Sequence, residues 1–336
     1  MGGSSASSNP ASVVAGIVEE HFRARREAAG KPLDGVLAVL NDLYVQVAKV
    51  AWMAPGAVLP ATAAGLDAGQ RLNAEAQRAP EPLSRWLAIA AQSSSSVRSG
   101  GARASVAAAA AQQLGPFCRD VETRFPFSRD PGAPDMPMDD FQRLFGPGGA
   151  FEQFFAQNLQ GFFDTSQRTW QPVAADGGPP PVSPSYVAQF QRAAAIRNAF
   201  FPPPLPGQPS KALQFELMPL ALGGATGAVL DVAGAKTVVS AGAVGARAAQ
   251  LSWPSPGRVS LTFDGEASPA LAADGPWAAL RFVARGRLQP TAVPDRLRLS
   301  VQQGGHAAEF ELRTSSIVHP FAMRELADFR CPRLKP

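Results

Sequence analysis

The chain has 336 residues, of which 46% are hydrophobic and 17% are charged. This composition allows a substantial buried core in two or three domains, and it excludes wholesale disorder. The net charge is only +4, and the basic residues are scattered rather than clustered among aromatic residues, which argues against nucleic-acid binding.

The first ten residues, MGGSSASSNP, have neither the basic segment nor the apolar segment of a signal peptide. We interpret residues 1–10 as a leader or a flexible linker. The longest candidate for a membrane span, residues 104–114, is an alanine-rich run that is too short for the roughly 18–20 residues that cross a bilayer. We therefore expect no transmembrane segment in this sequence.

Residues 11–130 are predicted to form a helical domain. The clearest apolar stripe with helical spacing lies in residues 33–52, and it consists of Leu33, Val36, Leu37, Leu40, Leu43, Tyr44 and Val47. Gly and Pro clusters at 54–60 and 79–82 separate further helices, including one at 82–92. The serine run 93–96 is typical of a flexible loop.

Residues 131–209 are predicted to be connecting helices followed by a proline-rich linker. Two helices, 139–146 and 149–163, are joined by a Gly-Pro-Gly-Gly corner. Asp139 is placed as a helix N-cap, an interpretation that we favour over an acid pair with Asp140. A third helix begins with Ser183 and Pro184 and ends before the run FPPPLPGQP at 201–209.

Large apolar residues recur at helical spacing on both sides of the Gly-Pro-Gly-Gly corner. We expect them to bury a wedge between the helical domain and the domain that follows. The predicted interdomain wedge consists of Phe141, Leu144, Phe145, Phe151, Phe154, Phe155, Leu159 and Phe162.

After the proline-rich run, apolar and polar residues alternate with a period of two, which predicts β-strands. The strands expected here lie at 213–217, 228–233, 236–240, 247–252, 258–264, 296–302 and 308–314, and a short helix is expected at 274–285. Gly304-Gly305 predicts a hairpin turn. The fold class is therefore α+β, with an N-terminal helical domain, an antiparallel β-sandwich at 210–320, and a tail at 321–336.

The sequence contains few candidate residues for catalysis or for binding a metal or cofactor. The histidines His21, His306 and His319 lie far apart and have no metal-ligand spacing. The sequence GAKT at 234–237 lacks the glycine before lysine that a phosphate loop requires, so a hairpin turn is the better interpretation. GGATG at 223–227 is likewise interpreted as a loop. We expect no catalytic residue, no cofactor and no metal site, and hence no enzyme activity.

Several segments together resemble a known family. They are PFCRDVETRFPFSRD (116–130), DFQRLFGPGGAFEQFFAQNLQGFFDTSQRTW (140–170), FQRAAAIRNAFF (190–201), LQFELMPL (213–220), LSWPSPG (251–257), GPWAALR (275–281) and DFRCP (328–332). In this order they resemble the periplasmic C-terminal region of IcmF/TssM, the large inner-membrane subunit of the type VI secretion system. The resemblance covers nearly everything after residue 10.

The resemblance implies a non-catalytic structural module that spans the periplasm and docks on the outer-membrane lipoprotein TssJ. It also implies the inner-membrane subunit TssL as a partner and self-association in the assembled complex. The transmembrane helices and the cytoplasmic nucleotide-binding-like domain of the family are not found in this sequence. Contact with a membrane is therefore expected only through upstream segments.

An alternative is a module that binds peptidoglycan or another envelope glycan. Such a module needs exposed aromatic side chains on one face of the sandwich. Trp253 and Trp277 are the tryptophans available there, and their neighbouring prolines favour packing instead.

The stretch 281–298 is rich in arginine and contains one acidic residue, Asp295. Its basic residues are Arg281, Arg285, Arg287, Arg296 and Arg298. One interpretation is a solvated basic face. The other is a charged rim that steers an acidic partner or lipid headgroups, which makes these arginines candidate partner-binding residues.

Two cysteines, Cys118 and Cys331, lie in two of the family-like segments. The oxidising periplasm that the resemblance implies would preserve a disulfide between them. The alternative is two unrelated buried thiols. A disulfide would require the C-terminal tail to return to the end of the helical domain.

Overall fold

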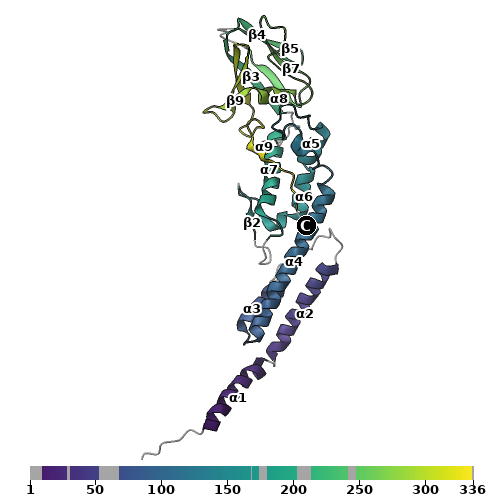
Figure 1. Ribbon diagram of the computed structural model, residues 1–336, viewed down its shortest axis with the longest axis vertical. Coiled ribbons are helices and arrows are strands. Elements are labelled where there is room, and N and C mark those ends of the chain that lie inside the picture. Colours follow the sequence, from purple (N-terminus) through teal and green to yellow (C-terminus); the bar gives the residue numbers. More distant parts are fainter. Residues whose placement is uncertain are drawn as a thin grey trace, which may run out of the picture. The chain divides into compact units, whose positions relative to one another are not determined.

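The computed structural model describes residues 10–28, 31–52, 68–167, 169–173, 180–202, 213–240 and 247–334 (Figure 1). Most of the expected leader 1–10 and of the proline-rich linker at 201–209 lies outside these residues. The chain divides into two compact units. The first comprises residues 1–112, 158–183 and 333–336, and the second comprises residues 113–157 and 184–332.

The first unit contains long helices. They are α1 (Pro10–Ala28), α2 (Lys31–Trp52), α3 (Ala68–Arg78) and α4 (Leu83–Gln113), whose last residue belongs to the second unit. Val36 and Leu43 from α2, Leu72 from α3 and Leu87 from α4 form one buried cluster. The spacing that predicted the helix at 33–52 thus places Val36 and Leu43 in this core, whereas Leu37 and Tyr44 of the same stripe are exposed.

The serine run in α4 corrects one expectation, because residues 93–96 lie inside this helix and not in a loop. The hydroxyl of Ser94 donates to the carbonyl of Ala91 at 2.7 Å, and Ser95 and Ser96 donate to the carbonyl of Gln92. Serine hydroxyls can bond to the preceding helical turn, and this satisfies them without breaking the helix.

The first unit also contains a short two-stranded hairpin. The turn η2 (Gln160–Phe162) leads into β1 (Phe163–Asp164), which pairs antiparallel with β2 (Gln171–Pro172). The helix expected to reach residue 163 therefore ends at Asn158.

The second unit combines short helices with two antiparallel sheets. The helical elements are η1 (Val121–Thr123), α5 (Met138–Phe145), α6 (Ala150–Asn158), α7 (Pro184–Phe200), α8 (Ala278–Arg285) and α9 (Arg324–Asp328). Helix α7 begins at Pro184, as predicted. The expected N-cap Asp139 is wrong, because α5 begins one residue earlier, with Pro137 at the cap position and no side-chain cap bond.

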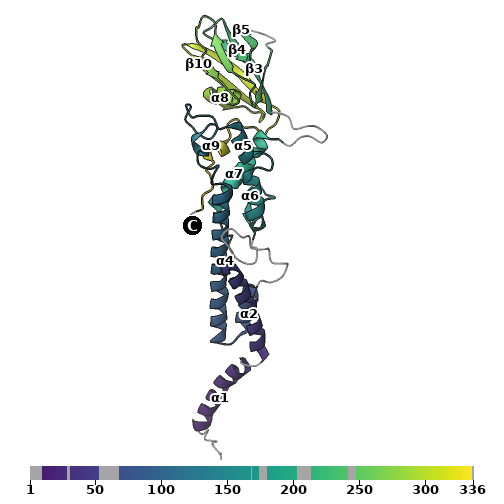
Figure 2. The same cartoon turned by 90° about the vertical axis from the view of Figure 1, so that its right-hand side faces the viewer.

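The sheets contain five and four strands, and every neighbouring pair is antiparallel. The larger sheet has the order β6-β3-β11-β10-β9 and the smaller has the order β5-β4-β7-β8. Figure 2 shows β3 and β10 of the larger sheet together with β4 and β5 of the smaller sheet. The strands are β3 (Leu213–Gly223), β4 (Gly227–Val232), β5 (Ala235–Ser240), β6 (Ala249–Trp253), β7 (Val259–Phe263), β8 (Leu271–Ala273), β9 (Arg287–Pro290), β10 (Arg296–Gln303) and β11 (His306–Thr314).

The alternation in sequence matches the burial in β11. In β11, Ala308, Phe310 and Leu312 are buried, while Glu309 and Glu311 between them are partly exposed. Gly304-Gly305 forms the predicted hairpin turn with positive φ angles of 56° and 89°. The GAKT segment belongs to a hairpin, because Gly234 lies in the turn between β4 and β5 and the next three residues begin β5.

The fold class is therefore confirmed, with helices in the N-terminal part and antiparallel sheets in the C-terminal part. The compact units do not divide at the expected boundaries near residues 130 and 209, because α5 and α7 pack with the sheets in one unit. Compactness alone does not say which segments fold independently, so the domain boundaries stay a prediction.

Candidate functional site

The Gly-Pro-Gly-Gly corner at residues 146–149 turns the chain sharply between α5 and α6. A Cβ atom at Gly146 would lie 2.4 Å from the carbonyl oxygen of Gln142, and one at Gly149 would lie 2.7 Å from that of Leu144. Gly148 has a positive φ of 68°, which other residues rarely adopt. Steric exclusion of side chains thus explains why the corner is rich in glycine.

Glu152 connects this corner to α7. Its carboxylate accepts a hydrogen bond from the Gly148 N–H at 2.8 Å and forms an ion pair with Arg197. Burial acts to raise the pKa of Glu152, but the Gly148 hydrogen bond and the Arg197 charge outweigh burial, and the pKa lies below its ordinary value. The ionised carboxylate therefore stabilises the corner.

We expect Glu152→Gln to lower the melting temperature at neutral pH, because the neutral amide loses the ion pair with Arg197. A depressed pKa in the folded state means that the stabilisation is present above the unfolded-state value, near 4.3, and is lost as pH falls through the folded value. Melting curves of both proteins between pH 7 and pH 3 should therefore converge at the acidic end.

The matched control for this variant is Asp139→Asn. Asp139 is exposed and also lies in the first turn of a helix, but its side chain has no hydrogen bond or ion pair with any described residue. It therefore reports the helix-dipole contribution alone. A difference between wild type and Glu152→Gln that stays constant at every pH would contradict the prediction.

The helices α5 and α7 meet the sheets through a group of aromatic rings, which we call the aromatic junction. It comprises Phe141 of α5, Phe200 of α7, Trp253 of β6 and Trp277 at the start of α8. Phe141 is fully buried, and its ring centroid lies 4.9 Å from that of Phe200, 5.5 Å from Trp253 and 5.1 Å from Trp277. The edge-to-face angles of these pairs are favourable for aromatic rings.

The rings of α6 pack on α7 instead of on the sheets. Phe151, Phe154 and Phe155 lie 5.4–6.1 Å from Phe190. Tyr186 packs on the same ring, and burial raises the pKa of its phenol. Together these contacts bind α6 and α7 to each other.

Two further phenylalanines pack against the rings of α5 and α6, and neither was predicted from the sequence. Phe127 stacks on Phe145 at 5.1 Å, and Phe329 lies 5.2 Å from Phe145 and 5.4 Å from Phe151. Neither residue belongs to a periodic stripe. Their presence in the family-like segments 116–130 and 328–332 was the available signal.

The predicted wedge residues fall in both units. Phe141, Leu144, Phe145, Phe151, Phe154 and Phe155 are buried in the second unit, which also holds the sheets. Leu159 is buried and Phe162 is half-buried, and both belong to the first unit. Contact between helices and sheets within the second unit runs through Phe141, whereas a wedge between domains stays a prediction.

Arg281 does not lie on the surface, as a partner-binding residue would, because its side chain is buried inside the second unit. Its guanidinium forms an ion pair with Asp135 at 2.5 Å and donates to the carbonyls of Pro131 and Ala133. It also lies 4.3 Å above the ring of Phe125. These contacts use its donors to hold the loop 131–136 against α8.

The four other candidate arginines are exposed. Arg285 donates to the carbonyl of Ala272 at 2.7 Å, and Arg287 lies on the edge strand β9. Arg296 and Arg298 lie on the outer face of β10, 3.5 Å and 3.9 Å from Glu311 and Glu309. The larger sheet therefore presents alternating charges of both signs, and ion pairs exposed in this way contribute little stability.

The two tryptophans of the sandwich are buried, with 2% of Trp253 and none of Trp277 exposed. The Trp277 indole N–H donates to the carbonyl of Met136 at 2.7 Å. These rings therefore face the aromatic junction and are not available as a glycan-binding platform.

The C-terminal tail lies against the helical part of the second unit. The structure pairs Cys118 with Cys331 as a disulfide, with 5.6 Å between their Cα atoms. The Cys331 N–H donates to Glu122 at 3.0 Å, and the Arg330 N–H donates to Gln189 at 2.7 Å. The tail is thus fixed by the two residues that directly follow Phe329.

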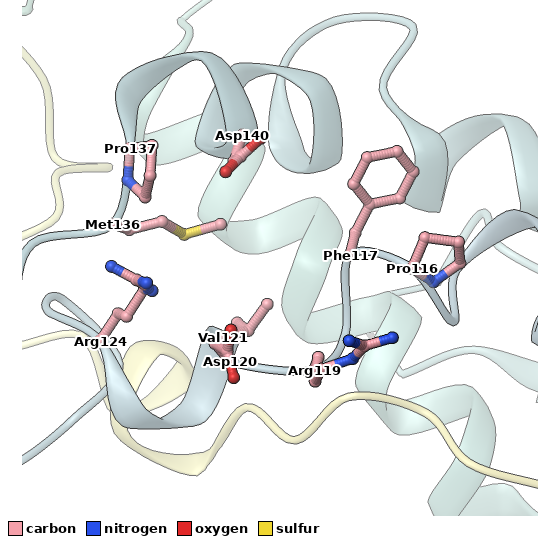
Figure 3. A pocket seen from close by; sticks show the side chains of 9 residues that line it. All are labelled: Pro116, Phe117, Arg119, Asp120, Val121, Arg124, Met136, Pro137 and Asp140. Atoms are coloured by element: carbon pink, nitrogen blue, oxygen red, sulfur yellow. The ribbon is translucent and has the colours of Figure 1, made fainter.

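A pocket of about 280 Å³ opens beside Cys118. Figure 3 shows Met136 and Asp140 on one side of the opening, Asp120 and Val121 on the opposite side, and Phe117 at its edge. Arg119 and Arg124 complete its charged rim.

The described residues bring together no group of three His, Cys, Asp or Glu side chains that could hold a metal ion. Among the residues that the structure describes, no helix is both long enough and apolar enough to cross a membrane.

Comparison with known proteins places this architecture in a family. Residues 215–316 match the family described as the type VI secretion protein IcmF C2-like domain. The type VI secretion system component TssM1 of Pseudomonas aeruginosa is 31% identical over 312 residues, which cover 90% of this chain and 28% of the relative. The chain therefore spans less than a third of the length of this relative.

Solved structures share the fold at lower sequence identity. The C-terminal domain of the type VI secretion protein TssM from EAEC superposes with a TM-score of 0.56 at 19% identity, over 68% of this chain and 96% of that domain. A chain of a type VI secretion system membrane core complex matches with a TM-score of 0.64 at 17% identity, over 80% of this chain and 57% of its own length. A chain of a type VI membrane complex matches with a TM-score of 0.59 at 15% identity, over 99% of this chain and 64% of its own length.

Proposed function

Because the chain belongs to the IcmF/TssM family and corresponds to its C-terminal region, we propose that it is a non-catalytic structural module of a type VI secretion membrane complex. In the cell it occupies the periplasm. It holds a β-sandwich at a fixed orientation to the helices that precede it in the second unit. Its role is to keep the β-sandwich in a fixed position within the complex, and it catalyses no reaction.

The aromatic junction carries this proposal. Phe141 contacts Trp253 and Trp277, which lie on different elements of the sandwich, and Arg281 adds a buried ion pair to Asp135. Interiors packed in this way deform little under load. A module that transmits position between membranes needs such stiffness between its helices and its binding domain.

We further propose that the sandwich docks on the outer-membrane lipoprotein TssJ, while the inner-membrane subunit TssL and other copies of the chain join it in the complex. The rival function, peptidoglycan binding, loses support because both sandwich tryptophans are buried. The exposed arginines Arg285, Arg287, Arg296 and Arg298 are the proposed steering charges.

Association with the purified lipoprotein tests this function. We expect binding at micromolar concentration or below, and we expect Arg296→Glu with Arg298→Glu to slow association at low salt and to flatten its salt dependence. Surface-based kinetics at several salt concentrations measure both quantities.

The matched control is Lys236→Glu with Arg258→Glu, which makes the same charge change but alters the smaller sheet. It should affect association less than the Arg296 and Arg298 pair. Equal association rates for wild type and the Arg296 and Arg298 double variant would assign those arginines to a solvated face. Binding to peptidoglycan without any affinity for the lipoprotein would overturn the proposed function.

A further inference from the structure

Two loops at one end of the larger sheet expose aliphatic side chains. Loop 291–295 connects β9 to β10, and loop 315–319 follows β11. Val293 in the first loop is 44% exposed, and Ile317 and Val318 in the second are 71% and 46% exposed. We call these three residues the aliphatic patch. They are three of the five large hydrophobic side chains that are exposed among the described residues of the second unit, and this grouping distinguishes them from the single exposed residues that most surfaces carry.

Hydrogen bonds hold the two loops side by side. The Thr314 N–H donates to the carbonyl of Asp295 at 2.9 Å, and the Thr314 hydroxyl lies 2.8 Å from the carbonyl oxygen of Ser316. His319 in the second loop lies 3.4 Å from the carbonyl oxygen of Pro294 in the first. The two loops therefore form one surface.

Each loop is also held by bonds within itself. The Thr291 hydroxyl lies 3.0 Å from the carbonyl oxygen of Val293 and 2.8 Å from that of Arg296, and the Val293 N–H donates to the Thr291 hydroxyl at 3.1 Å. In the second loop, the Val318 N–H donates to the Ser316 hydroxyl at 3.1 Å. The backbone that carries the aliphatic patch is thus fixed before a partner binds, and a preformed surface loses less conformational entropy on binding.

The surroundings of the aliphatic patch are basic on balance. Arg296 directly follows the first loop, and its N–H donates to the Val293 carbonyl at 3.0 Å. Arg298 lies on the same face of β10. Residues 285–324, which include both loops, contain six arginines (Arg285, Arg287, Arg296, Arg298, Arg313 and Arg324) and three acidic residues (Asp295, Glu309 and Glu311). This charge complements a partner whose apolar surface is bordered by acidic groups.

The side chains favour a protein partner over a lipid surface. Segments that lie in a membrane interface are rich in basic residues and insert tryptophan, phenylalanine or leucine. Residues 285–320 contain no lysine and no tryptophan, and their one phenylalanine, Phe310, is fully buried. Protein interfaces, in contrast, are enriched in arginine and depleted of lysine.

We propose that the aliphatic patch is the apolar centre of a docking surface for a folded protein whose own contact surface is apolar and bordered by acidic residues. This inference rests on the proposed function, in which the sandwich docks on the lipoprotein. It adds the residues that keep the complex together after the arginines have steered the encounter. Charges at the rim act mainly on the association rate, whereas contacts at the centre act mainly on the dissociation rate.

Ile317→Ser combined with Val318→Ser tests the inference in kinetics with the purified lipoprotein. We expect the complex of this double variant to dissociate about tenfold faster, while its association rate and the salt dependence of that rate stay those of wild type. The substitutions leave the backbone and hydroxyl bonds of the loops in place, so the melting temperature should stay close to that of wild type.

The matched control is Leu220→Ser combined with Val238→Ser. These side chains are similarly exposed, at 47% and 64%, but they lie outside the two loops. The complex of the control variant should dissociate like that of wild type. Faster dissociation of the control by the same factor would overturn the inference, because the effect would then not belong to the aliphatic patch.

Amide hydrogen exchange of the wild type gives a second measurement that needs no variant. Addition of the lipoprotein should slow exchange in residues 291–296 and 315–319. Unchanged exchange there, or a patch variant that dissociates like wild type, would overturn this inference and leave the proposed function in place. A wild type without affinity for the lipoprotein would overturn both. The inference would also fail if the patch variant lost self-association or binding to phosphatidylglycerol vesicles instead, because a second copy or a lipid surface would then cover the patch.

Discussion

Replacing Phe141 by alanine is expected to lower the free energy of unfolding by about 3–5 kcal/mol. The side chain is fully buried, and its ring contacts Phe200, Trp253 and Trp277 on three other elements. These elements are held in place by their own hydrogen bonds, so they can close only part of the cavity that truncation leaves. Denaturant unfolding, followed by tryptophan fluorescence, measures the loss.

Phe162→Ala provides the matched control for Phe141→Ala. Phe162 is half-buried in the first unit, and its truncation removes less packing. We expect it to cost clearly less than Phe141→Ala and to leave the tryptophan fluorescence unchanged. A loss below about 1 kcal/mol for Phe141→Ala would show that the aromatic junction does not hold α5 on the sheets, and this would remove the main support for a stiff module.

The sequence predicts the architecture well wherever one periodicity dominates. Residues 296–302 and 308–314 alternate strictly, so each can bury only one face, and both became neighbouring strands of the larger sheet. The sharp turn at residues 146–149 was equally predictable, because so many glycines close together usually mean that two stretches of backbone approach each other closely. The loop predicted at residues 93–96 was wrong. Serine alone favours loops, but inside a long helix its hydroxyl can bond to a carbonyl of the preceding turn.

Contacts between distant segments were much harder to predict. Arg281 looked like one member of a basic group, but its partner Asp135 is 146 residues away in sequence. Local charge patterns carry no information about such a pair, and only the fold brings it together. The same holds for Phe127 and Phe329, which join the phenylalanines of α5 and α6 from irregular segments without any period of their own.

The cysteine pair gives the second large expected effect. Protein produced in an oxidising compartment and denatured without reductant is expected to contain no reactive thiol. Cys118 and Cys331 are 213 residues apart in sequence, and closing so long a loop restricts the unfolded chain by roughly 5 kcal/mol in the chain-entropy model, which is an upper figure. Thiol quantification tests the bond itself, and unfolding of Cys118→Ser and Cys331→Ser measures what it contributes.

The two single variants and the double variant together separate a disulfide from two independent buried thiols. If the bond forms, each single variant already breaks it, so the double variant should lose little more than either alone. Unbonded thiols would instead give losses that add. The tail should respond as well, because Arg330 and Cys331, which directly follow Phe329, bind Gln189 and Glu122. Faster proteolysis after residue 320 in the variants would show its release, whereas two reactive thiols in the unreduced wild type would rule out the bond.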